Sequence, residues 1–110
     1  MSYNVRPAST FQRDAKALIK RYASLKNELA APPQQLTENP ALGTLLGNNC
    51  YKIRLAIKSK GKGKLGDTRV ITLVQIVEGQ VLVLTIYGKA EKEDLRPGEL
   101  QKLLKLVDLE

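Results

Sequence analysis

The chain has no histidine and only one cysteine among its 110 residues. The absence of histidine excludes Ser-His-Asp and Cys-His catalysis, because both need an imidazole base. It also removes one of the two usual ligand types of a zinc site, so we expect no metal centre. Cys50 has no second cysteine with which to form an internal disulfide. Any acid–base chemistry must therefore use Lys, Tyr, Asp or Glu, with Arg to stabilise charge.

The chain also lacks a long apolar run. No uninterrupted apolar segment approaches the ~18 residues of a membrane span, and the N-terminus has no apolar core of a signal peptide. We therefore expect a cytoplasmic protein with no membrane contact. The length of 110 residues predicts a single domain over residues 1–110, which is enough chain to bury a core without cross-links.

Positive charge is in excess and is concentrated in one segment. The chain has 18 Lys and Arg against 11 Asp and Glu, a formal net charge of +7. Residues 52–69 hold seven of the bases and one acid, a net charge of +6, whereas the rest of the chain holds 11 bases and 10 acids. Such clustering predicts a localised site for an anion. Aromatic residues make up only 5%, too few to predict a platform on which several nucleic-acid bases stack.

The N-terminal part predicts a strand followed by a helix. Residues 3–6 alternate in polarity as a strand does, and Pro7 ends the alternation. Ser9 to Gln12 fits a capping box at the start of a helix. The apolar stripe of this amphipathic helix comprises Phe11, Ala15, Leu18, Ile19 and Tyr22.

A second helix is predicted to begin at Ser24. The Pro32-Pro33 pair interrupts it, because a proline inside a helix removes a hydrogen bond and clashes with the preceding turn. The helix therefore either ends near Ala31 or restarts as a short piece from Pro33 to Glu38. Residues 39–47 contain an Asn-Pro pair and two glycines, and we expect a loop there.

The second half predicts a three-stranded antiparallel meander and a C-terminal helix. Residues 50–58 alternate strictly, with apolar side chains on one face and basic side chains on the other. Residues 69–77 and 81–87 are apolar and β-branched, and Glu78-Gly79 forms a turn between them. Pro97 is expected in the first turn of the last helix, whose apolar stripe comprises Leu100, Leu103, Leu104 and Val107. The predicted fold class is α+β.

The basic segment has a functional and a structural interpretation. Lys52 and Arg54 project from one strand face, where they can hold a phosphate backbone or form an ordinary solvated surface. The first alternative predicts nucleic-acid affinity that falls with salt. Arg69 either clamps a phosphate beside them or pairs with Asp67 as an edge residue.

Other chemistry-bearing residues also have structural interpretations. Tyr87 can stack on a base or share a proton, but a packed ring with a solvent-exposed hydroxyl is the commoner arrangement. Glu91, Glu93 and Asp94 look like paired carboxylates, but acids also suit the start of a helix, where the helix dipole is positive. Cys50 is expected to be a packing or edge residue, with almost nothing nearby in the sequence to lower its pKa.

Three motifs between Cys50 and Leu95 carry a family resemblance. They are Y-K-I-R-L in the basic strand, K-G-K-x-G in the loop before R-V-I, and L-T-I-Y-x-K-x-E-K-E-D-L after the last turn. Together with the N-terminal strand and two helices, they resemble the RelE/HigB-type toxins of bacterial type II toxin–antitoxin systems, in the RelE/ParE superfamily. The resemblance covers most of the chain and implies an antiparallel sheet flanked by helices.

The resemblance also implies an activity and partners. Such toxins are metal-independent endoribonucleases that enter the ribosomal A site and cut translated mRNA. They drive the RNA 2′-hydroxyl onto the adjacent phosphate with basic residues instead of a histidine pair, and no cofactor is implied. The implied partners are the ribosome, mRNA and a cognate antitoxin protein, which wraps the toxin and represses their operon with it.

Position by position, Lys52, Arg54 and Arg69 match active-site bases of the family. By this resemblance, Lys52 or Arg54 orients the phosphate or transfers a proton, and Arg69 stabilises the charge of the pentacoordinate transition state. The family's acid–base set is incomplete in this chain, and Tyr87, Lys89 or Lys92 is expected to substitute for the missing catalytic residues. The implied RNA-binding residues are Lys58, Lys60, Lys62, Lys64 and Lys92.

Several positions depart from the family pattern. Ala90 stands where an arginine follows the last strand, and the family's C-terminal tyrosine has no counterpart near Arg96. Gly66-Asp67 replaces a Gly-Gly pair and puts an acid near the phosphate clamp, and Pro32-Pro33 interrupts a helix. Two alternatives therefore stay open: a ParE-like toxin that inhibits a topoisomerase, and a catalytically weakened relative that binds RNA or an antitoxin.

Overall fold

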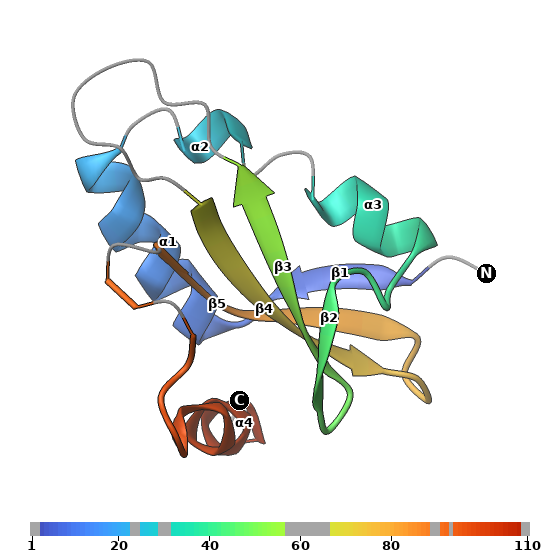
Figure 1. Ribbon diagram of the computed structural model, residues 1–110. Coiled ribbons are helices and arrows are strands. Elements are labelled where there is room, and N and C mark those ends of the chain that lie inside the picture. Colours follow the sequence, from blue (N-terminus) through green and yellow to red (C-terminus); the bar gives the residue numbers. More distant parts are fainter. Residues whose placement is uncertain are drawn as a thin grey trace.

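A five-stranded sheet with helices on both faces makes up the fold of the chain (Figure 1). The structure is a computed structural model that describes residues 3–22, 25–28, 32–56, 67–88, 91–92 and 94–108. The elements in chain order are β1 (Asn4–Pro7), α1 (Ser9–Arg21), α2 (Leu25–Glu28), α3 (Pro32–Glu38), β2 (Thr44–Gly47), β3 (Cys50–Ala56), β4 (Asp67–Gln75), β5 (Gln80–Gly88) and α4 (Glu99–Asp108). The predicted α+β class is confirmed.

The sheet has the strand order β1-β5-β4-β3-β2. Its centre is the predicted antiparallel meander, in which β3 pairs with β4 and β4 with β5. The predicted N-terminal strand is present as β1, which runs parallel to β5 at one edge. The strand predicted over residues 69–77 extends too far, because Ile76 and Val77 lie in the turn after β4 and are exposed.

The expectation of a loop over residues 39–47 is wrong for its second half. Residues Thr44–Gly47 form β2, an exposed edge strand that pairs with β3. Asn48 and Asn49 connect the two strands at φ 53° and 60°, the left-handed conformation of a two-residue hairpin turn. Gly43, at φ +104°, lies so close to β3 that an added Cβ would be 2.3 Å from the carbonyl oxygen of Lys52. A glycine is therefore required where β2 begins.

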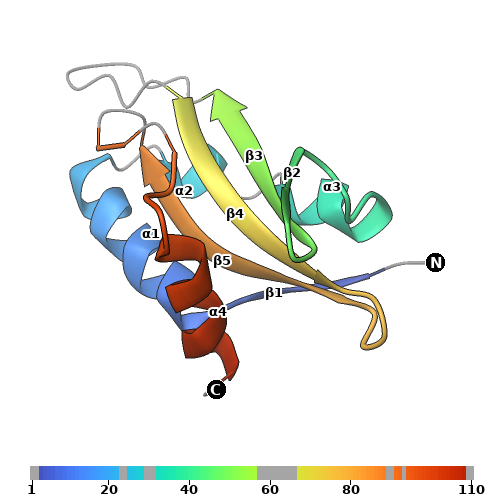
Figure 2. The same cartoon turned by 60° about the horizontal axis from the view of Figure 1, so that its bottom comes forward.

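Two apolar clusters hold the layers together, one on each face of the sheet. The larger one packs α1, α2 and α3 against one face and includes Leu18, Leu25 and Leu36. The smaller one packs α4 against the other face through Val107 and its neighbours, and α4 lies on the viewer's side in Figure 2. Among the described residues, no helix is long and apolar enough to span a membrane.

The helix boundaries settle the questions that the sequence left open. The second helix restarts, because α3 begins at Pro32 after the short α2. The capping box is wrong: Ala8 occupies the cap position of α1, and its methyl group offers no capping oxygen. Pro97 lies in a turn ahead of α4, and Gly98, at φ +82°, immediately precedes the helix.

A candidate anion site on the sheet

Three of the predicted site residues form a row across the meander. Arg54 of β3 is the direct partner of Arg69 of β4, and Arg69 is the direct partner of Tyr87 of β5. Directly opposed residues of an antiparallel pair project to the same face of the sheet. We call these three residues the basic row. Lys52 lies two residues before Arg54 and therefore on the same face, about 7 Å further along β3.

A β-bulge determines which face Tyr87 occupies. Ile71 pairs with Thr85 but the next residue of β4 pairs with Val83, so Leu84 is an extra residue in β5. Before the bulge, Val81 and Val83 pack with α1, and after it Tyr87 belongs to the cluster of α4. Regular alternation from Val83 would have sent Tyr87 to the α1 face. The bulge therefore redirects Tyr87 towards Arg69.

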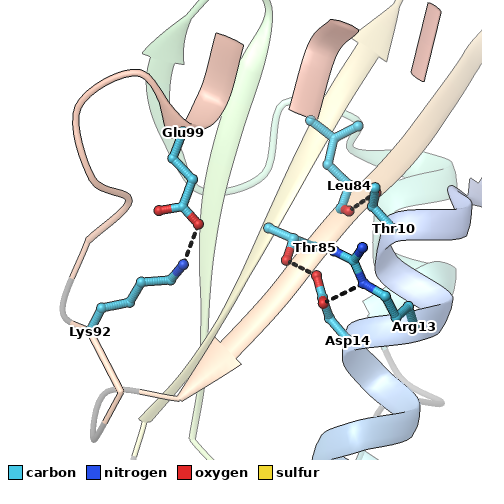
Figure 3. A network of polar contacts seen from close by, with 7 residues as sticks. All are labelled: Thr10, Arg13, Asp14, Leu84, Thr85, Lys92 and Glu99. Atoms are coloured by element: carbon cyan, nitrogen blue, oxygen red, sulfur yellow. Dashed lines mark hydrogen bonds and ion pairs between the residues drawn. The ribbon is translucent and has the colours of Figure 1, made fainter. Parts of the chain in front are cut away.

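Helix α1 fixes this bulge through two hydroxyl hydrogen bonds (Figure 3). Thr10 Oγ1 donates to the carbonyl oxygen of Leu84 at 2.5 Å. Thr85 Oγ1 donates to Asp14 Oδ2 at 2.6 Å, and Asp14 also accepts from Arg13 Nε at 3.3 Å. A buried carbonyl that a bulge removes from the sheet ladder needs a new donor, and Thr10 supplies it.

The basic row spans a steep gradient of exposure. Arg54 is exposed, whereas Arg69 is 1% and Tyr87 2% exposed. Arg69 lies in the central strand of the sheet, so its interpretation as an edge residue is wrong. Arg69 lies directly beside Arg54 on the neighbouring strand, which is the placement that the alternative of a phosphate clamp requires.

The hydroxyl of Tyr87 is not solvent-exposed, contrary to the structural interpretation of this residue. Its oxygen is buried and has no hydrogen-bond partner among the described residues. Burial raises the pKa of Tyr87 to about 12, with smaller contributions from the carboxylates of Asp94 and Glu99, while Arg69 acts in the opposite direction. Tyr87 is thus a protonated phenol at neutral pH, buried beside Arg69.

Asp94, one of the three neighbouring carboxylates noted in the sequence, is paired with Lys52, which the sequence did not indicate. Lys52 Nζ donates to Asp94 Oδ1 at 2.6 Å across 42 positions of the chain. The side chain of Lys52 is only 13% exposed, while that of Asp94 is 65% exposed. The hydrogen bond and charge of Lys52 lower the pKa of Asp94, and Arg69 and Arg54 lower it further. Asp94 does not lie at a helix start, since α4 begins at Glu99, so that interpretation is wrong.

Lys92 lies on the other side of Tyr87. Its Nζ forms an ion pair with Glu99 Oε2 (Figure 3) and lies 5.0 Å from the centre of the Tyr87 ring. Glu99 also accepts a hydrogen bond from the backbone N–H of Arg96 at 2.9 Å. The segment that follows β5 is thus tied to α4, and the charge of Lys92 is already balanced within the protein.

Two cavities meet at Tyr87. One, of about 220 Å³, is lined by Lys52, Tyr87, Asp94 and Arg96, with Leu46, Leu95 and Leu100 as apolar walls. The other, of about 370 Å³, lies between α1 and α4 and has Tyr87, Lys92 and Glu99 in its wall. Lys52 and Tyr87 thus share one wall of the smaller cavity, while the hydroxyl oxygen of Tyr87 stays buried.

The remaining predicted residues have varied outcomes. Lys58, Lys60, Lys62, Lys64 and Lys89 lie outside the described residues, as do Ala90 and the side chain of Asp67. Cys50 is a buried packing residue as predicted, and its burial raises the pKa of the thiol to about 11. No three His, Cys, Asp or Glu residues come together as a metal site within the ranges that the structure describes.

Comparisons with known proteins identify the fold. No protein-family model matches the chain. A double arginine-to-alanine mutant of the E. coli toxin RelE in the free state is similar in structure, with a TM-score of 0.59, 18% identity, and coverage of 97% of this chain and 95% of that one. The same toxin in complex with a RelBc antitoxin peptide is similar with a TM-score of 0.55 and 18% identity, over 87% of this chain and 97% of that one. The resemblance predicted from the sequence is therefore confirmed in the structure: this chain has the fold of a RelE toxin.

Proposed function

We propose that this protein is the toxin of a type II toxin–antitoxin pair and an endoribonuclease that cuts mRNA on the ribosome. The observation that carries the proposal is the basic row with Lys52 beside it, on one face of a RelE-type sheet. A fold alone does not define an activity. The side chains of this face do have the chemistry that RNA cleavage by its own 2′-hydroxyl requires.

The reaction needs positive charge around one phosphate. The 2′-hydroxyl loses its proton to solvent as its oxygen attacks the adjacent phosphorus, a pentacoordinate species with additional negative charge forms, and the bond to the 5′-oxygen breaks as that oxygen takes up a proton. Arg54 is exposed and binds a non-bridging oxygen, while Arg69, buried beside it, adds its positive charge from within the sheet and stabilises the developing negative charge. Lys52, a cation held by Asp94 in the free protein, orients the phosphate from the same face. The products are a 2′,3′-cyclic phosphate and a 5′-hydroxyl.

Tyr87 suits the role of proton donor in this scheme. Its raised pKa of about 12 keeps the phenol protonated at neutral pH, so it can donate to the departing 5′-oxygen but is a poor base. It lines the same cavity as Lys52, and proton donation requires its buried hydroxyl to become exposed when RNA binds. Lys89, next in the chain after Gly88, is a further basic residue of this proposed site.

The proposal includes a protein partner. The RelE toxin with the same fold has been solved with a RelBc antitoxin peptide, and we extend that type of partner to this chain. Binding of an antitoxin would hold the toxin inactive until the antitoxin is removed. The same basic face gives mRNA its contact with the toxin in the ribosomal A site.

The decisive experiment maps mRNA 5′ ends in a reconstituted translation reaction. Purified wild-type protein is compared with Lys52→Ala and with Lys20→Ala, a matched loss of one exposed lysine on α1. We expect new 5′ ends within A-site codons for the wild type and Lys20→Ala, none for Lys52→Ala, and none without ribosomes. Circular dichroism checks that all three proteins are folded.

Other outcomes point to the other functions. Equal cleavage by Lys52→Ala would remove Lys52 from the site. Growth arrest by the wild type with DNA-damage signalling and intact mRNA would indicate a topoisomerase inhibitor. RNA binding by a folded protein that cuts no mRNA and arrests no growth would indicate a catalytically inactive relative.

A further inference from the structure

We propose that Asp94 closes the phosphate site of the ligand-free protein, and that RNA binds only by displacing its carboxylate from Lys52. The inference rests on the proposed function, because it concerns the same anion site. It adds a form of regulation: the chain carries its own competitor for the phosphate.

The geometry of the ion pair is that of an occupied anion site. Asp94 Oδ1 accepts from Lys52 Nζ at 2.6 Å, a distance at which a phosphate oxygen would also bind an ammonium group. Lys52 projects from the rigid centre of the sheet, whereas Asp94 belongs to the connection between β5 and α4. A carboxylate from a distant part of the chain thus occupies a position suited to a phosphate oxygen.

The charges of the site converge on this carboxylate. Lys52, Arg69 and Arg54 all favour the ionised form of Asp94 and lower its pKa. These are the three basic residues of the proposed phosphate site. Asp94 therefore lies where their combined field is felt, which is where a bound phosphate would also lie.

The burial of the two partners shows which of them can move. The Lys52 side chain is 13% exposed and that of Asp94 is 65% exposed, so the carboxylate can turn into solvent while the lysine stays in place. Residues 94–98 form no helix or strand. Lys52 and Asp94 also share the wall of the cavity of about 220 Å³, from which an incoming group reaches the ion pair.

Displacement makes the site selective for a chain of phosphates. One phosphodiester carries the same single negative charge as the carboxylate, so a lone phosphodiester gains little by exchanging with it. An RNA strand gains further contacts from its neighbouring phosphates, which bind other basic residues of the protein. RNA therefore competes effectively with Asp94 where a single phosphodiester does not.

The test measures binding without cleavage. Fluorescence anisotropy at fixed ionic strength follows a short single-stranded RNA whose 2′-hydroxyls are all methylated, so that it cannot be cut. The proteins are the wild type, Asp94→Asn and Asp108→Asn, which removes one negative charge from the exposed end of α4. We expect Asp94→Asn to bind about fivefold more tightly, the size of one lost ion pair with an exposed carboxylate, and Asp108→Asn to bind less than about twofold more tightly.

A conservative variant distinguishes competition between the Asp94 carboxylate and phosphate from a purely structural role of Asp94. Asp94→Glu keeps the carboxylate, and we expect its affinity to stay near that of the wild type. The inference is overturned if Asp94→Asn binds no more tightly than Asp108→Asn, or if neither it nor the wild type binds the RNA. Tighter binding by Asp94→Asn supports the inference whether or not the wild type cuts mRNA, so failure of the proposed function is a separate result.

Discussion

Two adjacent rows of side chains cross the same three central strands on opposite faces of the sheet and differ in chemistry. The core row comprises Ile53, Val70 and Ile86, which are 5%, 2% and 3% exposed. One position along each strand, the basic row of Arg54, Arg69 and Tyr87 lies on the opposite face. The core row packs with α1, α2 and α3, whereas the basic row ends in an exposed arginine.

The difference between the rows follows from the alternation of a β-strand. Successive side chains point to opposite faces, so a shift of one residue exchanges an apolar row for a row of two arginines and a tyrosine. The same backbone hydrogen bonds hold both rows in register. We therefore expect changes in the core row to act on stability and changes in the basic row to act on RNA chemistry.

The largest effect on stability is expected for Ile86→Ala in the core row. Removing this buried side chain leaves a cavity beside Val70, and such changes cost about 3 kcal/mol of unfolding free energy. Val77→Ala is the matched control, because Val77 is 95% exposed and its loss should cost less than about 0.5 kcal/mol. Urea denaturation measures both, and equal midpoints for the two variants would contradict the assignment of the core row.

The next effect concerns the exposed end of the basic row. We expect Arg54→Ala to slow RNA cleavage about 100-fold, as the loss of one preorganised group that stabilises transition-state charge does. Its stability should change by less than about 0.5 kcal/mol, since the side chain is exposed. Arg13→Ala on α1, whose side chain is 71% exposed, controls for the lost charge. Undiminished cleavage by Arg54→Ala would remove this residue from the proposed site.

Much of the central sheet could be predicted because its signals are local. Strict alternation from Cys50 fixes the faces of Lys52 and Arg54, and short connections make β3, β4 and β5 antiparallel neighbours. Since β4 is apolar on both faces apart from Arg69 and its threonines, it is expected at the centre. These constraints make Arg54 and Arg69 neighbours on adjacent strands, whereas the register that pairs them directly comes from the structure.

The parts that could not be predicted depend on contacts between distant residues. Strand β2 escapes prediction because all its residues are exposed and show no alternation, although Asn48-Asn49 was an available turn signal. The face of Tyr87 depends on a bulge that α1 stabilises from 74 positions away. The partner of Lys52 lies 42 positions along the chain, and nothing near Asp94 in the sequence indicates it.

Alkaline pH should weaken the fold through the buried end of the basic row. The pKa of Tyr87 is raised to about 12 in the folded protein and is about 10 in an unfolded chain. The folded state thus binds the proton more tightly, and the resulting stability is complete below pH 10 and is lost as the pH rises towards 12. This group alone accounts for about 2 kcal/mol of that loss. Urea denaturation at pH 9, 10 and 11 measures this loss of unfolding free energy. If the unfolding free energy of Tyr87→Phe fell equally steeply with pH, the assignment of the loss to Tyr87 would be contradicted.

The smallest expected effect is a gain in stability for Tyr87→Phe at neutral pH. The buried hydroxyl has no partner among the described residues, and an unpaired buried polar group costs about 1 kcal/mol or more. Removing it while the ring stays packed should raise the unfolding free energy by about 1 kcal/mol and, if the phenol donates a proton, slow RNA cleavage. Tyr22→Phe on α1 is the matched control and should change neither. A destabilised Tyr87→Phe would show that the hydroxyl is hydrogen-bonded and that Tyr87 has a structural role. A Tyr87→Phe protein that is more stable but cuts RNA more slowly would show that the basic row keeps a destabilising hydroxyl for its chemistry.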